Sequence, residues 1–252
     1  MMDSLPPRPA ISLDAWYPQV AAVVPTPRTE IVRTSLPLDL LLDGEVPVGW
    51  ATFLDDLARA ADRVGGYPTF LRTGQGSGKH DWKHTCYVPA AADLESHVAA
   101  LVEWSALVDI LGLPTDVWVV REMLLTTAAF HAFGGMPITR ERRYFVRDGA
   151  ILGHHPYWPP EAIEAPDAAD WRARLERLNE EPAAEVALLS RLSRDVSRVV
   201  PGAWSVDWLA ARDGTWYCID LAHAERSYVW WEHPHAPTRL SLLGVTDQEV
   251  PV

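Results

Sequence analysis

The chain has 252 residues, of which 48% are hydrophobic, and its formal net charge at pH 7 is −12. The length and apolar content suffice for one large or two small globular domains, whereas the negative charge argues against nucleic-acid binding, which depends on lysine and arginine neutralising phosphates. The N-terminus has no basic segment followed by an apolar one, and no apolar run reaches about 18 residues, so we expect a cytoplasmic protein without a membrane span.

The first part of the chain is predicted to alternate between helices and strands. Residues 1–47 are proline-rich and are predicted to be irregular. Apolar residues at helical spacing predict a helix over residues 48–64, which ends at a glycine pair. Residues 67–73 and 82–88 are predicted strands on either side of a glycine-rich segment. A long helix with a mainly apolar stripe is expected over residues 91–111.

The second part is predicted to contain one strand, two hairpins and another long helix. Residues 116–125 (DVWVVREMLL) have the composition of a strand. Two strands are expected around the Asp-Gly turn at 148–149, and two more around the Asp-Gly turn at 213–214. Between the hairpins, a helix is predicted over 167–199 with an interruption near Pro182. This order predicts an α+β fold with mainly antiparallel sheets and two long helices.

The segment TGQGSGKHDWKHTC, residues 73–86, raises the question of a phosphate-binding P-loop. A Walker A loop needs its first glycine where this chain has Thr73, and a serine or threonine where it has His80. A strand is predicted to follow, so no helix N-terminus is offered to a phosphate. We therefore predict a glycine-rich turn that brings Lys79 and Lys83 toward a polyphosphate. A solvated hairpin loop with incidental lysines is the alternative.

The last hairpin places two carboxylates opposite each other. A two-residue loop at 213–214 pairs Asp207 with Asp220 and Trp208 with Ile219. Carboxylates that face each other across an antiparallel pair are destabilising unless a cation lies between them. Magnesium is held by one or two carboxylates together with phosphates and waters. We therefore predict a magnesium site at Asp207 and Asp220; the alternatives are a register slipped by one residue, or one exposed or protonated aspartate.

The earlier hairpin brings arginines to both faces of its sheet. A two-residue loop at 148–149 pairs Arg143 with His154 and Arg142 with His155. Neighbouring residues on a strand point to opposite faces, so one of the two arginines is expected on the working face. A guanidinium there can clamp a phosphate or a carboxylate; the alternative is a basic surface patch.

These motifs, in this order, resemble an ATP-grasp domain, and most of all the phage and bacterial clade of that superfamily named for one arginine and two lysines. The resemblance covers about residues 60–230, and a eukaryotic assembly chaperone for a translation initiation factor is similar in the same segments. Its motifs are the glycine-rich turn with its lysines, VVREMLL at 119–125, RERRYFV at 140–146 and SVDWLAARDGTWYCIDLAHAE at 205–225.

The resemblance implies a two-lobed, ATP-grasp-like fold that encloses ATP between α+β lobes. We expect residues 1–60 to form an irregular segment and a helix that packs on the core. The ATP-grasp-like domain is expected over residues 61–252, with a first lobe over about 61–118 and a second over about 119–252.

The resemblance also implies roles for single residues. Three cations would contact the phosphates: Arg72, Lys79 and Lys83. A hinge segment would bind adenine and ribose: Glu122, Met123 and Leu124. Arg143 would reach the γ-phosphate or an acyl phosphate as the catalytic residue. Asp207 and Asp220 would bind magnesium, the pair that the hairpin geometry indicates independently.

The chain departs from the family's pattern in its last strand. Many members have Asp/Glu-x-Asn there, whereas this chain has Ala222 two residues after Asp220. Either the second magnesium site is weaker, or His223 or Glu225 substitutes. Segment 154–160 (HHPYWPP) either lines an acceptor pocket or packs as a rigid aromatic loop.

The function implied is that of an ATP- and magnesium-dependent ligase. Such an enzyme activates a carboxylate as an acyl phosphate, which an amine or other nucleophile attacks. The alternatives are a nucleotide-binding assembly protein with little turnover and a structural domain that retains the fold without a nucleotide. The sequence names neither the carboxylate nor the nucleophile; a peptide or a protein is one candidate.

Overall fold

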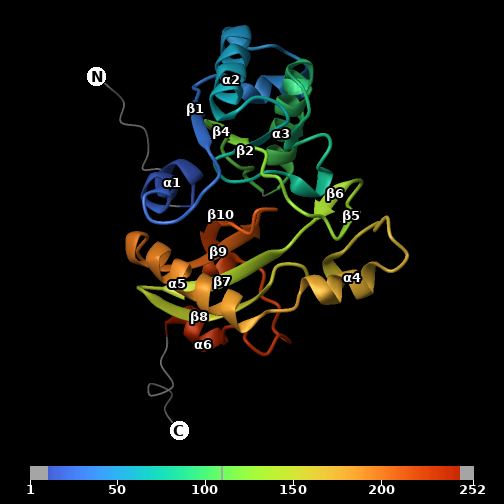
Figure 1. The fold of residues 1–252 in the computed structure, drawn as a ribbon. Helices are drawn as coiled ribbons and strands as arrows, with labels where there is room; N and C mark the ends of the chain where they lie inside the picture. The colour runs from blue at the N-terminus through green and yellow to red at the C-terminus, as the bar shows by residue number, and fades with distance from the viewer. Residues whose placement is uncertain (1–10, 109, 245–252) are drawn as a thin grey trace.

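Two four-stranded sheets form two lobes, one above the other (Figure 1). The computed structural model describes residues 11–108 and 110–244. Across the upper sheet the strands are β1 (Thr29–Arg33), β4 (Val117–Glu122), β2 (Thr69–Thr73) and β3 (Tyr87–Val88). Across the lower sheet they are β10 (Trp216–His223), β9 (Ala203–Ala210), β7 (Glu141–Arg147) and β8 (Ala150–Pro156). Their pairs are antiparallel, so the expected two-lobed α+β fold is confirmed.

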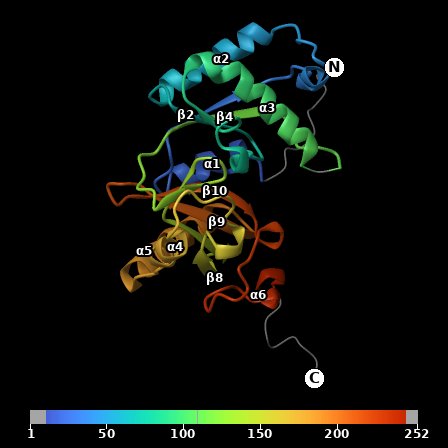
Figure 2. The same cartoon turned by 90° about the vertical axis from the view of Figure 1, so that its right-hand side faces the viewer.

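Two helices cover the outer face of the upper sheet (Figure 2). In α2 (Trp50–Val64) the buried residues recur at three- and four-residue spacing, as an amphipathic helix requires. The helix ends at Gly65, whose φ of 117° is accessible to glycine at little cost. α3 (Leu94–Leu107) is shorter than the predicted helix over 91–111, of which residue 109 lies outside the described residues. Both helices share a core cluster with Trp118 of β4.

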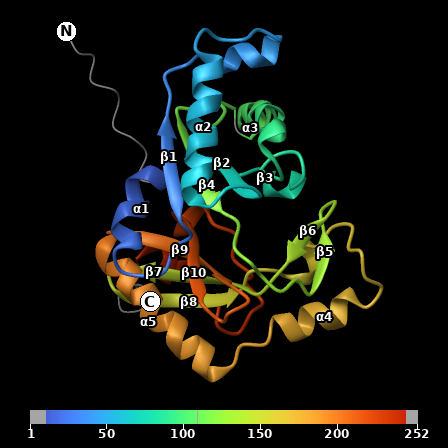
Figure 3. The same cartoon turned by 45° about the horizontal axis from the view of Figure 1, so that its top comes forward.

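The core of the lower lobe extends up to the first sheet. α5 (Ala183–Val199) packs against the lower sheet, and α1 (Leu13–Ala21) lies between that core and β4 (Figure 3). Trp16 of α1 belongs to the same cluster as Val119 of β4 and Trp208 of β9. The two lobes are therefore joined on this side by continuous apolar packing.

A third cluster joins the lobes on the other side. It contains Trp82, from the segment after β2, together with Trp158 and residues of a small hairpin and a short helix. The hairpin is β5 (Phe130–Ala132) with β6 (Met136–Ile138), and the helix is α4 (Trp171–Leu178), which is separated from α5 at Pro182 as predicted. The remaining short helices are η1 (Leu38–Asp43), η2 (Lys79–Asp81), η3 (Ala91–Asp93), η4 (Pro160–Ala162), η5 (Ala224–Arg226) and α6 (Arg239–Leu243).

In the β7–β8 hairpin the observed strand pairing differs from the predicted register. Its turn has the expected two-residue form, because φ is positive at both loop residues, 46° and 83°. A β-bulge then shifts the pairing between Phe145 and Val146. Beyond the bulge Arg143 pairs with His155, and the predicted pair with His154 is wrong. The bulge adds one residue to β8, which sequence spacing alone does not reveal.

The β9–β10 hairpin contains two irregularities that cancel. Its loop has three residues, because Ala211 N donates to Thr215 O and Gly214 adopts a φ of 88°. The pairing near the loop is therefore shifted, and Trp208 pairs with Cys218 instead of Ile219. A second shift between Cys218 and Asp220 restores the register, so that Asp220 pairs with Asp207 as predicted.

Two segments differ from their predicted structure. The strand predicted over 82–88 is reduced to β3, because the Thr85 hydroxyl donates to the carbonyls of Gly78 and Asp81 and closes a compact turn. The segment predicted as irregular over 1–47 contains α1 and β1, and residues 1–10 of it lie outside the described residues. The predicted domain boundaries stay predictions.

The C-terminal segment covers the edge of β8, and one glycine permits this contact. A Cβ atom added at Gly153 would lie 2.4 Å from Pro237 N and 2.8 Å from His235 O, both of them backbone atoms. We expect Gly153→Ala to lower the free energy of unfolding by about 1–3 kcal/mol, because the backbone has to move apart. Urea denaturation measures this, and an unchanged midpoint would contradict the close packing.

Candidate functional site

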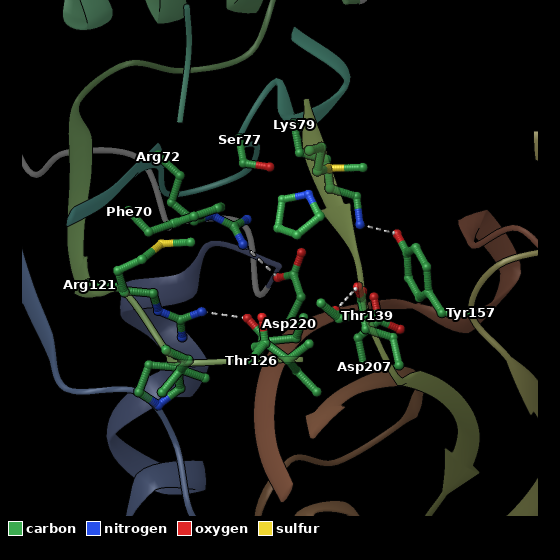
Figure 4. Close-up of a pocket in the computed structure, with 18 of the residues that line it drawn as sticks. Phe70, Arg72, Ser77, Lys79, Arg121, Thr126, Thr139, Tyr157, Asp207 and Asp220 are labelled. Carbon is green, nitrogen blue, oxygen red and sulfur yellow. Dashed lines mark hydrogen bonds and ion pairs between the residues drawn. The ribbon is translucent and has the colours of Figure 1, made fainter. Parts of the chain in front are cut away.

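A cavity of about 200 Å³ lies between the two sheets and is lined by residues of both lobes (Figure 4). Its lining includes eight residues that the sequence predicted for the site: Arg72, Lys79, Glu122, Met123, Leu124, Arg143, Asp207 and Asp220. Strand ends and loops far apart in the sequence are therefore brought to one place.

One row of paired residues crosses the lower sheet and faces this cavity. Asp220 of β10 pairs with Asp207 of β9, Asp207 with Arg143 of β7, and Arg143 with His155 of β8. Arg143 donates to both oxygens of Asp207, over 2.7 and 2.8 Å. Burial lowers the pKa of Arg143, but the adjacent Asp207 carboxylate outweighs this and raises it. Arg142 lies on the opposite face, where it binds Glu185.

The upper lobe supplies a second arginine to the carboxylate pair. Arg72 of β2 is buried and its Nη1 lies 3.0 Å from Asp220 Oδ1. The row therefore holds two carboxylates that are compensated by two guanidinium groups, one from each lobe. Neighbouring Arg121 of β4 donates to the carbonyl oxygen of Ile219, the residue at the irregularity in β10. Burial and the nearby Arg72 lower the pKa of Arg121 to about 10.

Lys79 enters the cavity from the glycine-rich segment and contacts the lower lobe. Its Nζ donates to the Tyr157 hydroxyl over 2.7 Å. Burial lowers the pKa of an ammonium group, but Tyr157 and Glu141 outweigh it, so the pKa of Lys79 is raised. This cation remains charged throughout the physiological pH range.

Glu141 is a buried carboxylate in the cavity that the sequence analysis did not select. Its Oε1 accepts hydrogen bonds from Thr139 Oγ1 and Trp158 Nε1, each over 3.1 Å. Burial raises the pKa of Glu141, and the Lys79 ammonium opposes this rise. The sequence contained a signal for it, because Glu141 lies two residues before Arg143 on the same strand and hence on the same face.

The segment that leads out of β4 borders the cavity. β4 ends at Glu122, whose carboxylate is bound by the backbone N and the Nε of Arg28 over 2.7 and 2.8 Å. The next two residues, Met123 and Leu124, also line the cavity. Apolar side chains from both lobes form the nearby walls: Phe70, Met136, Leu209 and Ile219.

Three residues that the sequence proposed lie elsewhere. Lys83 is exposed and is not part of the cavity lining; its side chain lies against Gly135. His223 stacks on Trp204, with ring centroids 4.7 Å apart, and Glu225 is exposed. Neither can therefore take the position of the asparagine that is replaced by Ala222.

The donor set suits a divalent cation only when a ligand supplies further oxygens. Within residues 11–108 and 110–244, no group of three or more histidine, cysteine, aspartate or glutamate residues could hold a metal. Asp207 and Asp220 offer carboxylate oxygens to the cavity, and both already contact guanidinium groups. Magnesium is commonly held by one or two carboxylates with phosphates and waters, so the pair fits magnesium as part of a metal–phosphate complex.

No helix in the described part of the chain is long and apolar enough to cross a membrane.

A family model described as an ATP-grasp domain, family 3 of the clade named for one arginine and two lysines, matches residues 63–230. No curated protein matches the chain in sequence. Among solved structures, C-terminally truncated Cdc123 from Schizosaccharomyces pombe is similar with a TM-score of 0.52 and 14% identity, over 84% of this chain and 82% of that chain. D-alanine–D-alanine ligase from Bacillus anthracis, complexed with ATP, has a TM-score of 0.45 and 12% identity, over 84% of this chain and 52% of that chain. At such identity, the similarity to Cdc123 shows the fold alone.

His155, at the end of the row, makes stability depend on pH. Its Nδ1 lies 2.7 Å from Pro156 O and its Nε2 accepts from Trp230 N over 3.3 Å, which assigns the neutral Nδ1–H tautomer. Burial lowers its pKa to about 4. Because this is below the unfolded value of about 6.5, the unfolded chain binds the proton first, and stability falls as the pH drops from about 6.5 to 4.

We therefore expect the wild-type protein to lose about 2 kcal/mol more stability than His155→Gln between pH 7.5 and pH 5. Chemical denaturation at both pH values measures the difference. Equal losses in the two proteins would show that His155 is not kept neutral by the fold.

Proposed function

The chain belongs to the ATP-grasp domains, in family 3 of the clade named for one arginine and two lysines, and from this premise we propose that it binds ATP with magnesium between its lobes and activates a carboxylate as an acyl phosphate. An amine or other nucleophile then attacks the acyl carbon, and phosphate leaves. The observation that carries this proposal is one cavity whose lining combines apolar side chains with the carboxylate pair and with the cations Arg72, Lys79, Arg121 and Arg143.

The apolar side chains of the lining suit the adenine ring. Phe70 and Leu209 offer apolar surface from opposite lobes, and Met123 and Leu124 line the same cavity. Backbone N–H and C=O groups can pair with the hydrogen-bonding edge of a base. Glu141, as a buried acceptor, is suitably placed in the lining to receive a ribose hydroxyl.

The charged side chains of the lining suit the triphosphate. Lys79, Arg72 and Arg143 line the cavity, and each can donate to phosphate oxygens. Asp207 and Asp220 would hold the magnesium ion, which supplies neutralisation of the charge that develops on the phosphates. Arg143 lines the cavity and binds Asp207 of the carboxylate pair, so it is the residue that we assign to the transferred phosphoryl group. Exposed Lys83 has no part in this proposal.

A specific observation also favours a second candidate, a nucleotide-binding assembly protein with little turnover. Ala222 provides no metal ligand, and His223 and Glu225 lie outside the cavity lining. A site with one carboxylate pair can bind a metal–nucleotide complex without a second metal to complete the chemistry.

Asp220→Asn tests the carboxylate pair. Removing this charge should leave ATP affinity without magnesium equal or greater, and reduce the gain in affinity on adding magnesium by about tenfold. Isothermal titration with a non-hydrolysable ATP analogue measures both values. Asp213→Asn, in the loop of the same hairpin and outside the cavity lining, is the matched control and should bind like the wild type. An unchanged magnesium effect in Asp220→Asn would remove the metal assignment.

Turnover distinguishes the two candidate functions. For a ligase we expect ADP and phosphate to form only when a carboxylate and an amine are both supplied from a panel of amino acids and peptides. A melting temperature that rises with magnesium and ATP, without turnover on any pair, would favour the binding protein. If neither ATP nor ADP raised the melting temperature, both candidates would be wrong.

A further inference from the structure

The side chain of Tyr157 contacts two of the cavity's cations, Lys79 and Arg143, and Figure 4 shows its hydroxyl facing Lys79. Lys79 Nζ is 2.7 Å from its hydroxyl and 3.9 Å from its ring centroid. The Arg143 guanidinium carbon is 4.7 Å from the same ring. An aromatic ring attracts cations to its faces, so the Tyr157 ring is a common partner of both cations.

The backbone that carries Tyr157 is held firmly. Its N–H donates to Glu141 O over 3.1 Å, and the carbonyl of the next residue, Trp158, accepts from Asn179 Nδ2 over 2.8 Å. Three prolines flank the pair and restrict φ: Pro156, Pro159 and Pro160. The segment HHPYWPP is therefore a rigid aromatic loop that also lines the cavity.

Lys79 reaches this loop on a flexible four-carbon side chain. Its backbone follows Gly78 and begins η2, in the turn that the Thr85 hydroxyl closes. Among the described residues, no carboxylate lies within ion-pairing distance of its Nζ. Its contacts are the Tyr157 hydroxyl and the rings of Tyr157 and Trp158, the latter at 4.9 Å. An ammonium group has three donors, and the bond to Tyr157 uses one of them.

We propose that Tyr157 is a positioning residue that fixes Lys79, and with it Arg143, where the terminal phosphates of the nucleotide bind. The inference rests on the proposed function and extends it. The hydroxyl and the ring hold one ammonium N–H toward the rigid loop, so the remaining donors are aimed before the ligand arrives. Such preorganisation strengthens the binding of a ligand only if Lys79 contacts that ligand. Ligands with and without the terminal phosphates should therefore respond differently to the loss of the hydroxyl.

The first experiment needs no nucleotide. Lys79 and Lys83 are the only lysines in the sequence, and Lys83 is exposed, so it serves as an internal reference. The folded protein is treated with an amine-acylating reagent, and the rates at both lysines are followed by mass spectrometry. We expect Tyr157→Phe to raise the Lys79 rate relative to Lys83 several-fold, because the raised pKa of Lys79 depends partly on the hydroxyl. An unchanged ratio of the two acylation rates would show that the Tyr157 hydroxyl does not hold Lys79.

The second experiment measures which ligands bind more weakly when the Tyr157 hydroxyl is removed. In Tyr157→Phe we expect binding of the β,γ-imido analogue of ATP, with magnesium, to weaken about tenfold, while AMP binds as to the wild type. In a Lys79→Met background the same substitution should have no further effect, since the hydroxyl acts through the ammonium group. Tyr228→Phe is the matched control, because its hydroxyl donates to Glu161 and its side chain is not part of the cavity lining.

The outcomes separate this inference from the proposed function. If the wild type binds the ATP analogue and Tyr157→Phe binds it equally well, the positioning role is wrong and the proposed function stands. Equal weakening for AMP, or an undiminished effect in the Lys79→Met background, would mean that Tyr157 acts only on the structure. If the wild type binds no nucleotide, the proposed function is wrong. The inference that Tyr157 positions Lys79 for the terminal phosphates is then wrong as well.

Discussion

The pairing of Asp207 with Asp220 on neighbouring strands is the constraint on which the rest of the site depends. Two carboxylates in register repel each other, and in this structure each contacts an arginine, Arg143 from the same sheet and Arg72 from the sheet above. The repulsion within one lobe is thus relieved in part by the other lobe. In the proposed function a magnesium–phosphate complex would offer the same compensation, so the ligand and the contact between the lobes would compete for this pair of carboxylates.

The sequence predicted the pairing of Asp207 with Asp220 correctly, although it predicted the length of the hairpin loop incorrectly. A three-residue loop shifted the register near the tip, and the irregularity at Ile219 shifted it back. In the other hairpin a single bulge left the shift in place, and His155 stands where His154 was expected. Bulges depend on what packs against a strand, here the C-terminal segment over Gly153, and such contacts are distant in sequence.

The residues that make up the site were predictable only in part from the sequence. Arg72 and Arg143 were selected through the family resemblance, because alternation along the strand places either Arg142 or Arg143 on the working face without choosing between them. Once Arg143 is placed, the same alternation selects Glu141. Tyr157 lies in a loop, and its two cations come from segments remote in the chain, so no local pattern revealed it. Lys83 was selected as part of a strand that Thr85 replaces with a turn.

The packing of β1 and α1 has a consequence for how the chain can be divided. β1 borders β4, and α1 shares a core with strands of both sheets. A fragment restricted to the family-matched residues 63–230 would lack both elements and α2 as well. It would leave the edge of β4 unpaired and apolar surface uncovered, a combination that favours aggregation. Within the described residues, α1 and β1 therefore pack as part of the same unit as the family-matched segment.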